Sequence, residues 1–317
     1  MSIESNPSTE KSEGVACAAC DSRNLISWGR LPVNSADFLG SALDSGIDPG
    51  ILFECRNCTL RFRAPRPTEE QLLAYYHRMD VTQCWQHGPE REVWRYIKQE
   101  LDHIPQPSVL DVGCFRGEML GYLGDGLERF GVEPSREAAL EAQRRGVTVI
   151  GESIESLSEI GRRFGAITLI DVAEHLPRPL DSLKRLTRLL LPGGKLIVFT
   201  GSTDALSWRL SGLDYYYSAM PEHVVFMRPS WFRWAASKMN CDIASIRRMR
   251  YQTSSRLKQI DEGLKNLLYI GYHRLPFFST ILSKLPLLKR IGQWQGCWWT
   301  SAKDHILVIM TKVASVE

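Results

Sequence analysis

Residues 108–117 carry the feature that most constrains the fold of this chain. A β-prone run at 109–112 is followed by a turn between Gly113 and Gly117, and a helical pattern begins at Glu118. Glycine has no Cβ, so the backbone can turn sharply there and approach a ligand closely. The start of the helix adds free N–H groups beside the turn. Strand, glycine turn and helix in this order form the ligand-binding corner of an open α/β sheet.

The pattern of strands and helices continues regularly on both sides of this corner. Strands are predicted at 108–113, 129–133, 148–150, 166–171, 195–200, 243–251 and 305–310, and helices at 67–76, 89–103, 136–145, 180–190 and 231–238. Alternating strands and helices predict an α/β fold with a mostly parallel sheet and helices on both faces. Ligands of such sheets bind beyond the carboxyl ends of the strands. Asp111, Glu133 and Asp171 fall at such ends.

The acids and the turn indicate a nucleoside ligand. Glu133 follows the second strand, where a carboxylate can accept hydrogen bonds from a ribose diol. The spacing of a nicotinamide dinucleotide site is absent, because Phe115 stands two positions after Gly113. Asp111, before the first glycine, suits a cofactor that carries a positive charge. An ordinary strand, turn and helix without a ligand is the alternative.

The segment 111–117 resembles motif I of the class I S-adenosylmethionine (SAM) methyltransferases, Asp-x-Gly-x-Gly-x-Gly, and departs from it at Phe115. Segments 151–153, 171–176 and 191–195 resemble later motifs of the same family, in the same order. The resemblance implies a Rossmann-like class I fold whose last strand is antiparallel, and SAM as the cofactor. The residues it places at the cofactor are Asp111, Gly113, Cys114, Phe115, Gly117, Glu133, Pro134, Glu152, Ser153, Asp171 and Val172.

A second resemblance concerns the segment 220–226, Met-Pro-Glu-His-Val-Val-Phe. It is similar to the Tyr-x-Glu-His stretch of the sugar C-methyltransferases, with Met220 in place of the tyrosine, and similar Glu-His segments occur in sugar O-methyltransferases. This resemblance implies that His223 is the base, oriented by Glu222 or a tyrosine. A histidine that only packs or caps the next helix is the alternative.

Two further side chains are candidates for the same site. His175, just after the fourth strand, is the second candidate base. Tyr76 lies in a helix for which Thr68 and Gln71 predict a capping box. Its hydroxyl either faces the active site or packs in the core. The aromatic stretch 201–221 is expected to be a loop that forms a lid or an acceptor wall.

Two Cys-x-x-Cys pairs, Cys17 with Cys20 and Cys55 with Cys58, precede the sheet. Four thiolates are the tetrahedral ligand set that structural Zn²⁺ prefers, and the set leaves no open position for catalysis. Reduced, unligated cysteines are the alternative. A redox dithiol is disfavoured because no βαβ context surrounds either pair. The other four cysteines are predicted to be structural: Cys84, Cys114, Cys241 and Cys297.

Composition excludes some classes of function. The 317 residues are 44% hydrophobic and carry a formal net charge of +3, which is too mild to indicate nucleic acid binding. No apolar run has the length of a membrane-spanning helix, and the polar start of the chain lacks the apolar core of a signal peptide. We therefore expect a cytoplasmic protein with reduced cysteines.

These observations divide the chain. The predicted parts are a disordered tail (1–14), a zinc-binding domain (15–66), a helical linker (67–105), a methyltransferase domain (106–251 plus 302–316) and a helical insertion (252–301). The insertion mixes apolar and basic residues. Its helices pack either on the core or on a second subunit in a homodimer, or they form a basic amphipathic surface on anionic lipid, at the inner face of the membrane.

The function indicated is SAM-dependent methyl transfer to a sugar hydroxyl of a glycan or nucleotide sugar. His223 would remove the proton of the hydroxyl group as the new bond forms. Three alternatives stay open: sugar C-methylation, methylation of a small molecule or protein, and a SAM- and zinc-binding scaffold without turnover.

Overall fold

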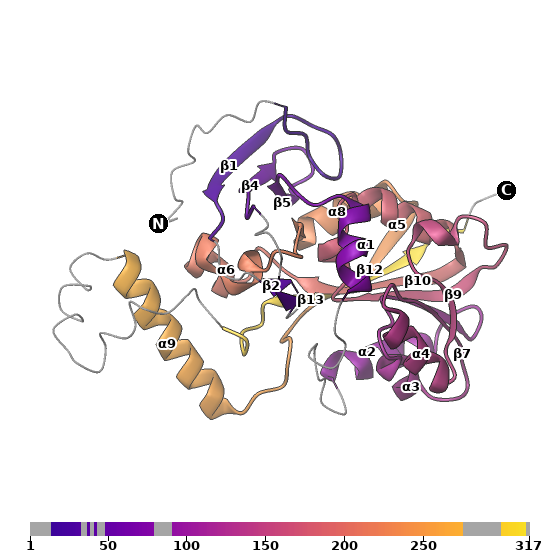
Figure 1. Ribbon diagram of the computed structural model, residues 1–317. Helices are drawn as coiled ribbons and strands as arrows, with labels where there is room; N and C mark the ends of the chain where they lie inside the picture. The colour runs from indigo at the N-terminus through magenta and orange to yellow at the C-terminus, as the bar shows by residue number, and fades with distance from the viewer. Residues whose placement is uncertain are drawn as a thin grey trace.

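A seven-stranded sheet lies at the centre of the molecule (Figure 1). Its strands are β6 (Ser108–Val112), β7 (Glu128–Val132), β8 (Thr148–Gly151), β9 (Phe164–Ile170), β10 (Leu190–Gly201), β12 (Cys241–Met249) and β13 (His305–Lys312). Their order is β12-β13-β10-β9-β6-β7-β8. The five strands from β10 to β8 are parallel, whereas β13 is antiparallel to both of its neighbours. The predicted mostly parallel sheet and the antiparallel last strand are confirmed.

The computed structural model describes residues 14–32, 37–38, 41–42, 48–78, 91–274 and 299–314. Some predictions lie outside these ranges. They concern the first 13 residues of the tail, the start of the 89–103 helix, much of the insertion after residue 274, and the cysteines Cys84 and Cys297.

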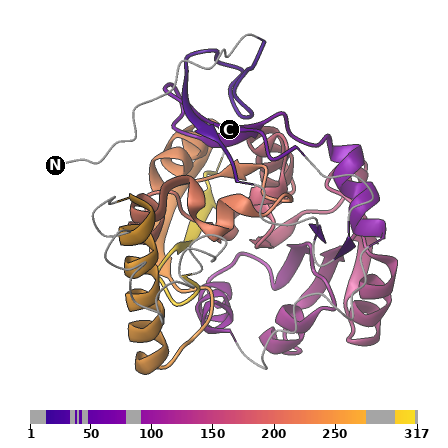
Figure 2. The same cartoon turned by 60° about the vertical axis from the view of Figure 1, so that its left-hand side comes forward.

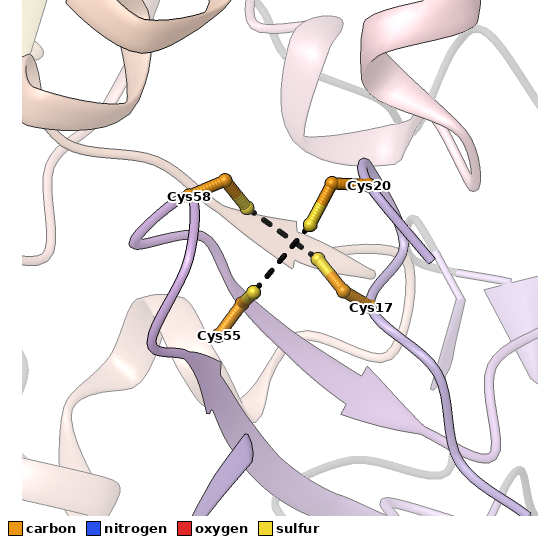
Figure 3. Close-up of side chains that lie close together, drawn as sticks. All are labelled: Cys17, Cys20, Cys55 and Cys58. Atoms are coloured by element: carbon orange, nitrogen blue, oxygen red, sulfur yellow. Dashed lines mark hydrogen bonds between the residues drawn. The ribbon is translucent and has the colours of Figure 1, made fainter. Parts of the chain in front are cut away.

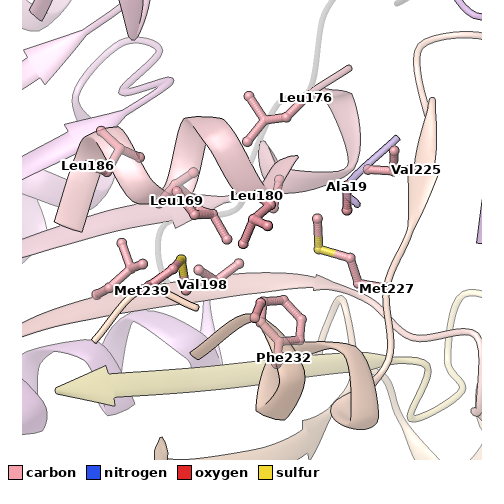
Figure 4. Close-up of a cluster of buried hydrophobic side chains, with 14 of the residues drawn as sticks. Ala19, Leu169, Leu176, Leu180, Leu186, Val198, Val225, Met227, Phe232 and Met239 are labelled. Atoms are coloured by element: carbon pink, nitrogen blue, oxygen red, sulfur yellow. The ribbon is translucent and has the colours of Figure 1, made fainter. Parts of the chain in front are cut away.

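Alternating side chains of the sheet build a core on each face. In β10, Leu196 and Val198 face one core, and Ile197 and Phe199 face the other, because successive side chains of a strand point to opposite sides. The first core is covered by α5 (Pro179–Arg188) and α8 (Pro229–Ser237); Figure 4 shows Val198 among residues of these helices. On the opposite side in Figure 1 lie α2 (Glu92–Leu101), α3 (Glu118–Leu123) and α4 (Arg136–Arg144).

Local signals set the starts of two helices. α1 (Glu69–His77) begins with the predicted capping box: the Thr68 hydroxyl accepts from Gln71 N, and the Gln71 side chain accepts from Thr68 N. In α4, the Ser135 hydroxyl accepts from Ala138 N at 3.4 Å. Such caps satisfy N–H groups that a helix leaves without partners at its start.

The stretch 201–221 is not the predicted loop. It forms α6 (Leu206–Ser211), a 3₁₀ turn (Gly212–Asp214) and α7 (Tyr216–Ala219). Trp208 and Tyr215 are buried in an apolar cluster, and helical turns satisfy the backbone groups that are buried with them. The turn predicted at 192–194 is likewise absorbed into β10, as an irregularity of register between Leu190 and Lys195. Two further 3₁₀ turns are η1 (Glu155–Leu157) and η2 (Ala173–His175).

The cysteine-bearing segment forms a second sheet, which we call the cysteine module (residues 15–66). Its strands are β1 (Leu25–Arg30), β4 (Ile51–Cys55) and β5 (Arg61–Ala64), with a two-stranded ribbon of β2 (Asp37–Phe38) and β3 (Ser41–Ala42). A fourth strand, β11 (Val225–Phe226), pairs antiparallel with β5. The cysteine module is therefore joined by backbone hydrogen bonds to a strand that begins two residues after His223.

The insertion contributes one long helix to the described residues, α9 (Arg256–Arg274), which stands along one side of the molecule in Figures 1 and 2. Four large apolar side chains of α9 are exposed: Leu257, Ile260, Leu264 and Leu267. None of the helices in the described ranges is both long enough and apolar enough to cross a membrane.

Candidate active site

A cavity of about 440 Å³ lies at the carboxyl ends of β6, β7 and β9. β6 is the first strand of the parallel region, and the later strands lie on both sides of it, so this edge is the topological switch point where such sheets bind ligands. All of the predicted catalytic and cofactor-binding residues line the cavity except Gly117 and Glu222. Gly117 instead begins α3 with a φ of +77°, and a Cβ there would meet Val147 at 3.0 Å.

The glycine turn holds an unusual conformation. Gly113 has a φ of +73°, and a Cβ at this position would lie 2.6 Å from Val172 Cγ2. Phe115 has a φ of +48°, in the left-handed region that costs a residue with a side chain about 1–2 kcal/mol. Its N–H donates to Glu133 Oε2 at 2.8 Å, so the departure from the motif is accommodated by the neighbouring strand end.

Two buried carboxyl groups lie against this turn. Glu133 Oε1 accepts from Ser135 N at 2.8 Å, and Asp111 Oδ1 accepts from Thr168 Oγ1 at 2.6 Å. Burial raises the pKa of each carboxyl group to about 7, against the opposing effect of these hydrogen bonds. Both groups can therefore change protonation near neutral pH when a charged or hydrogen-bonding ligand enters.

Arg91 faces the same cavity and was not predicted. Its Nη1 donates to Asp171 Oδ2 at 2.8 Å, and its guanidinium lies over the rings of Tyr251 (4.6 Å) and Phe199 (5.4 Å). Arg91 Nε and Nη2, and Asp171 Oδ1, are buried without a hydrogen-bond partner among the described residues. Buried polar groups normally have hydrogen-bond partners, so these unpaired atoms mark a place where a polar ligand would bind.

The side of the cavity where the sequence resemblance places the adenine is formed by residues that follow β7 and β8. Pro134, Glu152 and Ser153 lie on its wall, together with Cys114. A carboxylate oxygen of Glu152 lies 3.5 Å from His77 Nε2, and both side chains are exposed. This part of the cavity is therefore open to solvent.

Two histidines meet at the other end of the cavity. The rings of His175 and His223 lie edge to face with their centroids 5.0 Å apart. His223 Nδ1 lies 2.8 Å from the Tyr217 carbonyl oxygen, and His175 Nδ1 lies 3.1 Å from the Glu222 carbonyl oxygen. A carbonyl can only accept, so each Nδ1 carries the proton, and in a neutral ring Nε2 is then the unprotonated nitrogen. Tyr76 lies edge-on to His175 at 6.1 Å.

The surroundings keep both histidines neutral. Burial lowers the pKa of His175 to about 4. Burial, followed by the neighbouring His175, lowers the pKa of His223 well below its ordinary value. Tyr217 orients His223 through its backbone, whereas Glu222 contributes its backbone carbonyl to His175 and lies off the cavity wall.

Glu174 completes this group. Its carboxylate accepts from the hydroxyl of Tyr217 at 2.7 Å and from Thr200 at 2.8 Å, and burial raises its pKa to about 7. One potential ligand atom of Glu174, of His175 and of His223 lies within 4.8 Å of the other two. Both carboxylate oxygens already accept hydroxyl hydrogen bonds, which favours an acid–base role for the group over cation binding.

A second acid–histidine pair, also unpredicted, lies at the start of β13. His305 Nδ1 is 2.8 Å from Asp304 Oδ1, and Asp304 Oδ2 accepts from the hydroxyls of Tyr215 and Tyr216. Burial alone would lower the pKa of His305, but the charge of Asp304 outweighs it and raises the pKa. Because β13 is antiparallel, its first residue lies at the same edge of the sheet as the carboxyl ends of the parallel strands.

Outside the cavity, the four cysteines of the module come together (Figure 3). Cys17 Sγ lies 3.5 Å from Cys58 Sγ, and Cys20 Sγ lies 3.6 Å from Cys55 Sγ. Tetrahedral Zn²⁺ with bonds of about 2.3 Å requires sulfurs about 3.8 Å apart, so the set fits this ion. The contact with Cys58 also lowers the pKa of the Cys17 thiol, which favours the thiolate form that a metal ion binds.

The strand order, the glycine turn and the acids at the strand ends define a class I SAM-dependent methyltransferase. Residues 80–246, more than half of the chain, match the family described as "Methyltransferase domain", and the chain belongs to this family.

Curated relatives support the same class. The chain is 31% identical over 150 residues to a ubiquinone biosynthesis O-methyltransferase of Serratia proteamaculans (strain 568), a match that covers 43% of this chain and 62% of the relative. It is 30% identical over 157 residues to the protein of the same name from Coxiella burnetii (strain RSA 331 / Henzerling II), which covers 45% of this chain and 67% of the relative. The chain therefore spans less than two thirds of the first of these relatives and about two thirds of the second. Their names refer to ubiquinone biosynthesis, so the predicted sugar acceptor stays a proposal.

Among solved structures, the [4+2]-cyclase SpnF aligns with a TM-score of 0.50 at 14% identity and covers 79% of this chain and 98% of that one. At this identity the likeness shows the fold alone.

Proposed function

We propose that this protein transfers the methyl group of SAM to a hydroxyl group, with His223 as the base. The observation that carries the proposal is the 2.8 Å contact between His223 Nδ1 and the Tyr217 carbonyl, which leaves Nε2 as a proton acceptor on the cavity wall. The depressed pKa of His223, due first to burial, keeps the ring neutral at physiological pH.

Residues of the cavity fit the parts of SAM. The free N–H groups of Arg91 suit the carboxylate of its methionine, because a guanidinium binds carboxylates with several N–H groups at once. Glu133 suits the ribose hydroxyls, and Glu152 and Ser153 lie where the adenine is expected. When bound, SAM supplies an electrophilic methyl group beside a sulfonium.

The protein lowers the barrier of the reaction by positioning the acceptor and by transferring a proton. Alignment of an acceptor oxygen with the methyl carbon can lower the barrier by about 7–11 kcal/mol. Removal of the hydroxyl proton by a neutral histidine contributes about 10²–10⁴-fold in rate. Glu174, with its raised pKa and its hydrogen bond to Tyr217, lies close enough to stabilise the imidazolium that forms.

We take a sugar hydroxyl, in a glycan or nucleotide sugar, as the first candidate acceptor. The Glu222-His223 segment supports it, and so do the rings of Tyr76, Tyr216 and Tyr217 on the cavity wall, because aromatic faces pack well against the flat faces of sugar rings. An intermediate of ubiquinone biosynthesis is the second candidate, favoured by the names of the relatives.

The test is incubation with labelled SAM and a panel of sugar nucleotides, oligosaccharides and ubiquinone-biosynthesis intermediates. Transfer to a sugar oxygen supports the first acceptor, and transfer to a ubiquinone intermediate supports the second. A product methylated on carbon would instead show sugar C-methylation. SAM binding without transfer to any acceptor would indicate a non-catalytic scaffold.

His223→Ala should lower kcat by about 10²–10⁴-fold, with the Kd of SAM unchanged. His103→Ala, an exposed histidine outside the cavity wall, is the matched control. Normal turnover by His223→Ala would remove the base from the proposal.

We further propose that the cysteine module binds one structural Zn²⁺ through Cys17, Cys20, Cys55 and Cys58, on the strength of their sulfur geometry. Elemental analysis of protein purified under reducing conditions should find one zinc per chain. Cys58→Ser should lose it, and Cys241→Ser, a buried cysteine outside the cluster, should retain it. Wild-type protein without zinc would contradict the assignment.

For the insertion we propose peripheral contact with anionic lipid through α9. The exposed Leu257, Ile260 and Leu264 follow helical spacing beside the basic Arg256 and Lys258, a combination typical of interfacial helices. Sedimentation with anionic vesicles should fall for Leu257→Gln/Leu264→Gln. If the wild type were a homodimer and the same substitutions dissociated it, a second subunit would instead cover these exposed leucine and isoleucine side chains.

A further inference from the structure

Arg63 is a deeply buried charged side chain of the cysteine module, and its guanidinium lies against the segment that carries His223. Only 1% of the residue is exposed. Its Nη2 donates to the carbonyl oxygens of Ser218 at 2.9 Å and Met220 at 2.8 Å. Its backbone N–H donates to the Val224 carbonyl at 3.1 Å. One residue of β5 thus holds three peptide groups of 218–224.

Those peptide groups set the position of the candidate base. The Met220 carbonyl accepts both from Arg63 Nη2 and from His223 N, at 3.2 Å. The Tyr217 carbonyl, in the residue before Ser218, fixes the His223 ring through Nδ1. Arg63 is therefore connected to His223 only through hydrogen bonds and the backbone of 217–220, and no other side chain lies in this connection.

Burial makes this arrangement costly. No ion pair of Arg63 occurs in the part of the chain that the structure describes, and its guanidinium is directed at neutral carbonyls. Burial lowers the pKa of Arg63 to about 10, against the charge of Glu222, which raises it. A buried charge that does not form a salt bridge is expensive for stability, so stability alone gives little reason for an arginine at this position.

The cysteine module also contacts the residues that follow β11. Arg228 Nε donates to the Thr59 carbonyl at 2.9 Å, and the Thr59 and Ser230 hydroxyls lie 2.8 Å apart. Thr59 directly follows Cys58, a member of the cysteine cluster. Between these contacts and those of Arg63, β11 pairs with β5. The module thus contacts the chain on both sides of β11, at 218–224 and at 228–230.

We propose that Arg63 is a positioning residue, through which the cysteine module holds the backbone of 217–223 so that His223 faces the acceptor. This inference rests on the proposed function, in which His223 is the base. It assigns the cysteine module a role in the chemical step, although none of its residues from 15 to 66 lies on the cavity wall among those described.

Arg61 provides a matched control on the same strand. It is largely buried, pairs with Glu54 at 2.8 Å and lies over the Trp28 ring at 4.2 Å, all within the module. Arg61→Ala removes a buried cation of β5 and weakens the module without touching the carbonyls of 218–220. Arg63→Lys is the conservative variant, because an ammonium can still donate to both carbonyls.

The first experiment is hydrogen exchange on the full chain, which needs neither SAM nor an acceptor. We expect faster exchange of the amides of 218–224 in Arg63→Ala, near wild-type exchange in Arg63→Lys, and no change there in Arg61→Ala. If Arg63→Ala does not fold, the experiment uses Arg63→Gln, whose shorter amide keeps a single donor nitrogen. Exchange in this segment that is equal in Arg63 and Arg61 variants would overturn the inference.

The second experiment measures turnover on the acceptor that the panel identifies. A displacement of about 1 Å at a reacting group can cost about 10²-fold in rate. We therefore expect Arg63→Ala to lose about that factor in kcat, with KM and the Kd of SAM unchanged and substantial recovery in Arg63→Lys. A kcat loss no greater than that of Arg61→Ala would overturn the inference. If His223→Ala itself kept full turnover, the assignment of His223 as the base would be wrong. The exchange result would still decide whether Arg63 orders the segment 218–224.

Discussion

Arg91 and Asp171 lie 80 positions apart in the chain, and their side chains meet at 2.8 Å on the wall of the cavity. Asp171 accepts with Oδ2, while Nε and Nη2 of Arg91 are buried without a hydrogen-bond partner among the described residues. The pair thus anchors a guanidinium at the end of β9 and leaves it able to bind an anion.

The first prediction concerns this free side of Arg91. Hydrogen bonds to charged groups contribute about 1.5–3 kcal/mol, so Arg91→Ala should weaken SAM binding by about 10–150-fold. Calorimetry with SAM measures the change. Arg247→Ala is the control, because Arg247 stacks on Tyr96 away from the cavity wall. Equal affinity in wild type and Arg91→Ala would contradict the assignment.

The second prediction follows from the raised pKa values of Asp111 and Glu133, both about 7. Near pH 7 each is about half protonated in the free protein. A cation nearby, or a ribose hydroxyl that donates to the carboxylate, favours the ionised form. SAM binding should therefore release about one proton at pH 7, and affinity should rise as pH increases through 7.

Calorimetry in two buffers of different ionisation enthalpy gives the number of protons released. Asp111→Asn should reduce that number. A binding heat that does not depend on the buffer would show that these groups keep their protonation state.

The third prediction concerns the stability contributed by neutral His175. Its pKa is about 4 in the folded protein and about 6.5 in the unfolded chain. Between these values only the unfolded chain binds the proton, so stability is retained above pH 6.5 and falls as pH drops toward 4. The loss is on the order of 3 kcal/mol.

Urea unfolding of wild type and His175→Asn across this range isolates the effect. The asparagine can still donate to the Glu222 carbonyl but does not titrate. The variant should therefore lose less stability than the wild type on acidification. Parallel stability curves for the two proteins would disprove the neutral buried state.

The fourth prediction tests the packing beneath the glycine turn. A Cβ at Gly131 would lie 2.4 Å from Cys114 Sγ and 3.1 Å from Val147 Cγ1. Gly131→Ala should cost about 1–3 kcal/mol, and Cys114→Ala in the same chain should recover part of that loss. Gly161→Ala, where no atom lies within 4 Å of the added Cβ, is the control. Additive effects of the two substitutions would show that they do not touch.

Much of the fold could be predicted from local pattern. The strands that carry Asp111, Glu133 and Asp171 have runs of apolar residues, and apolar periodicity reports the secondary structure of one segment at a time. The helices of 206–219 were missed because their cause is tertiary: Trp208 and Tyr215 are buried by contacts that sequence spacing does not express.

The site divides in the same way. His175 and His223 could be predicted because each stands in a short motif. Arg91 could not, because it lies outside any motif and reaches Asp171 only after the sheet has formed. Asp304 and His305 could not be predicted either, because their place at the cavity end of the sheet depends on the antiparallel direction of β13.

The pairing of β5 with β11 has a consequence for synthesis on the ribosome. β5 ends at Ala64 and its partner begins at Val225, so about 160 residues must be translated before the cysteine module receives its fourth strand. At typical elongation rates this takes on the order of ten seconds. Throughout that interval β5 presents an unpaired edge to the nascent chain and its neighbours, and the positive charges of Arg61 and Arg63 on that edge discourage premature pairing with other strands.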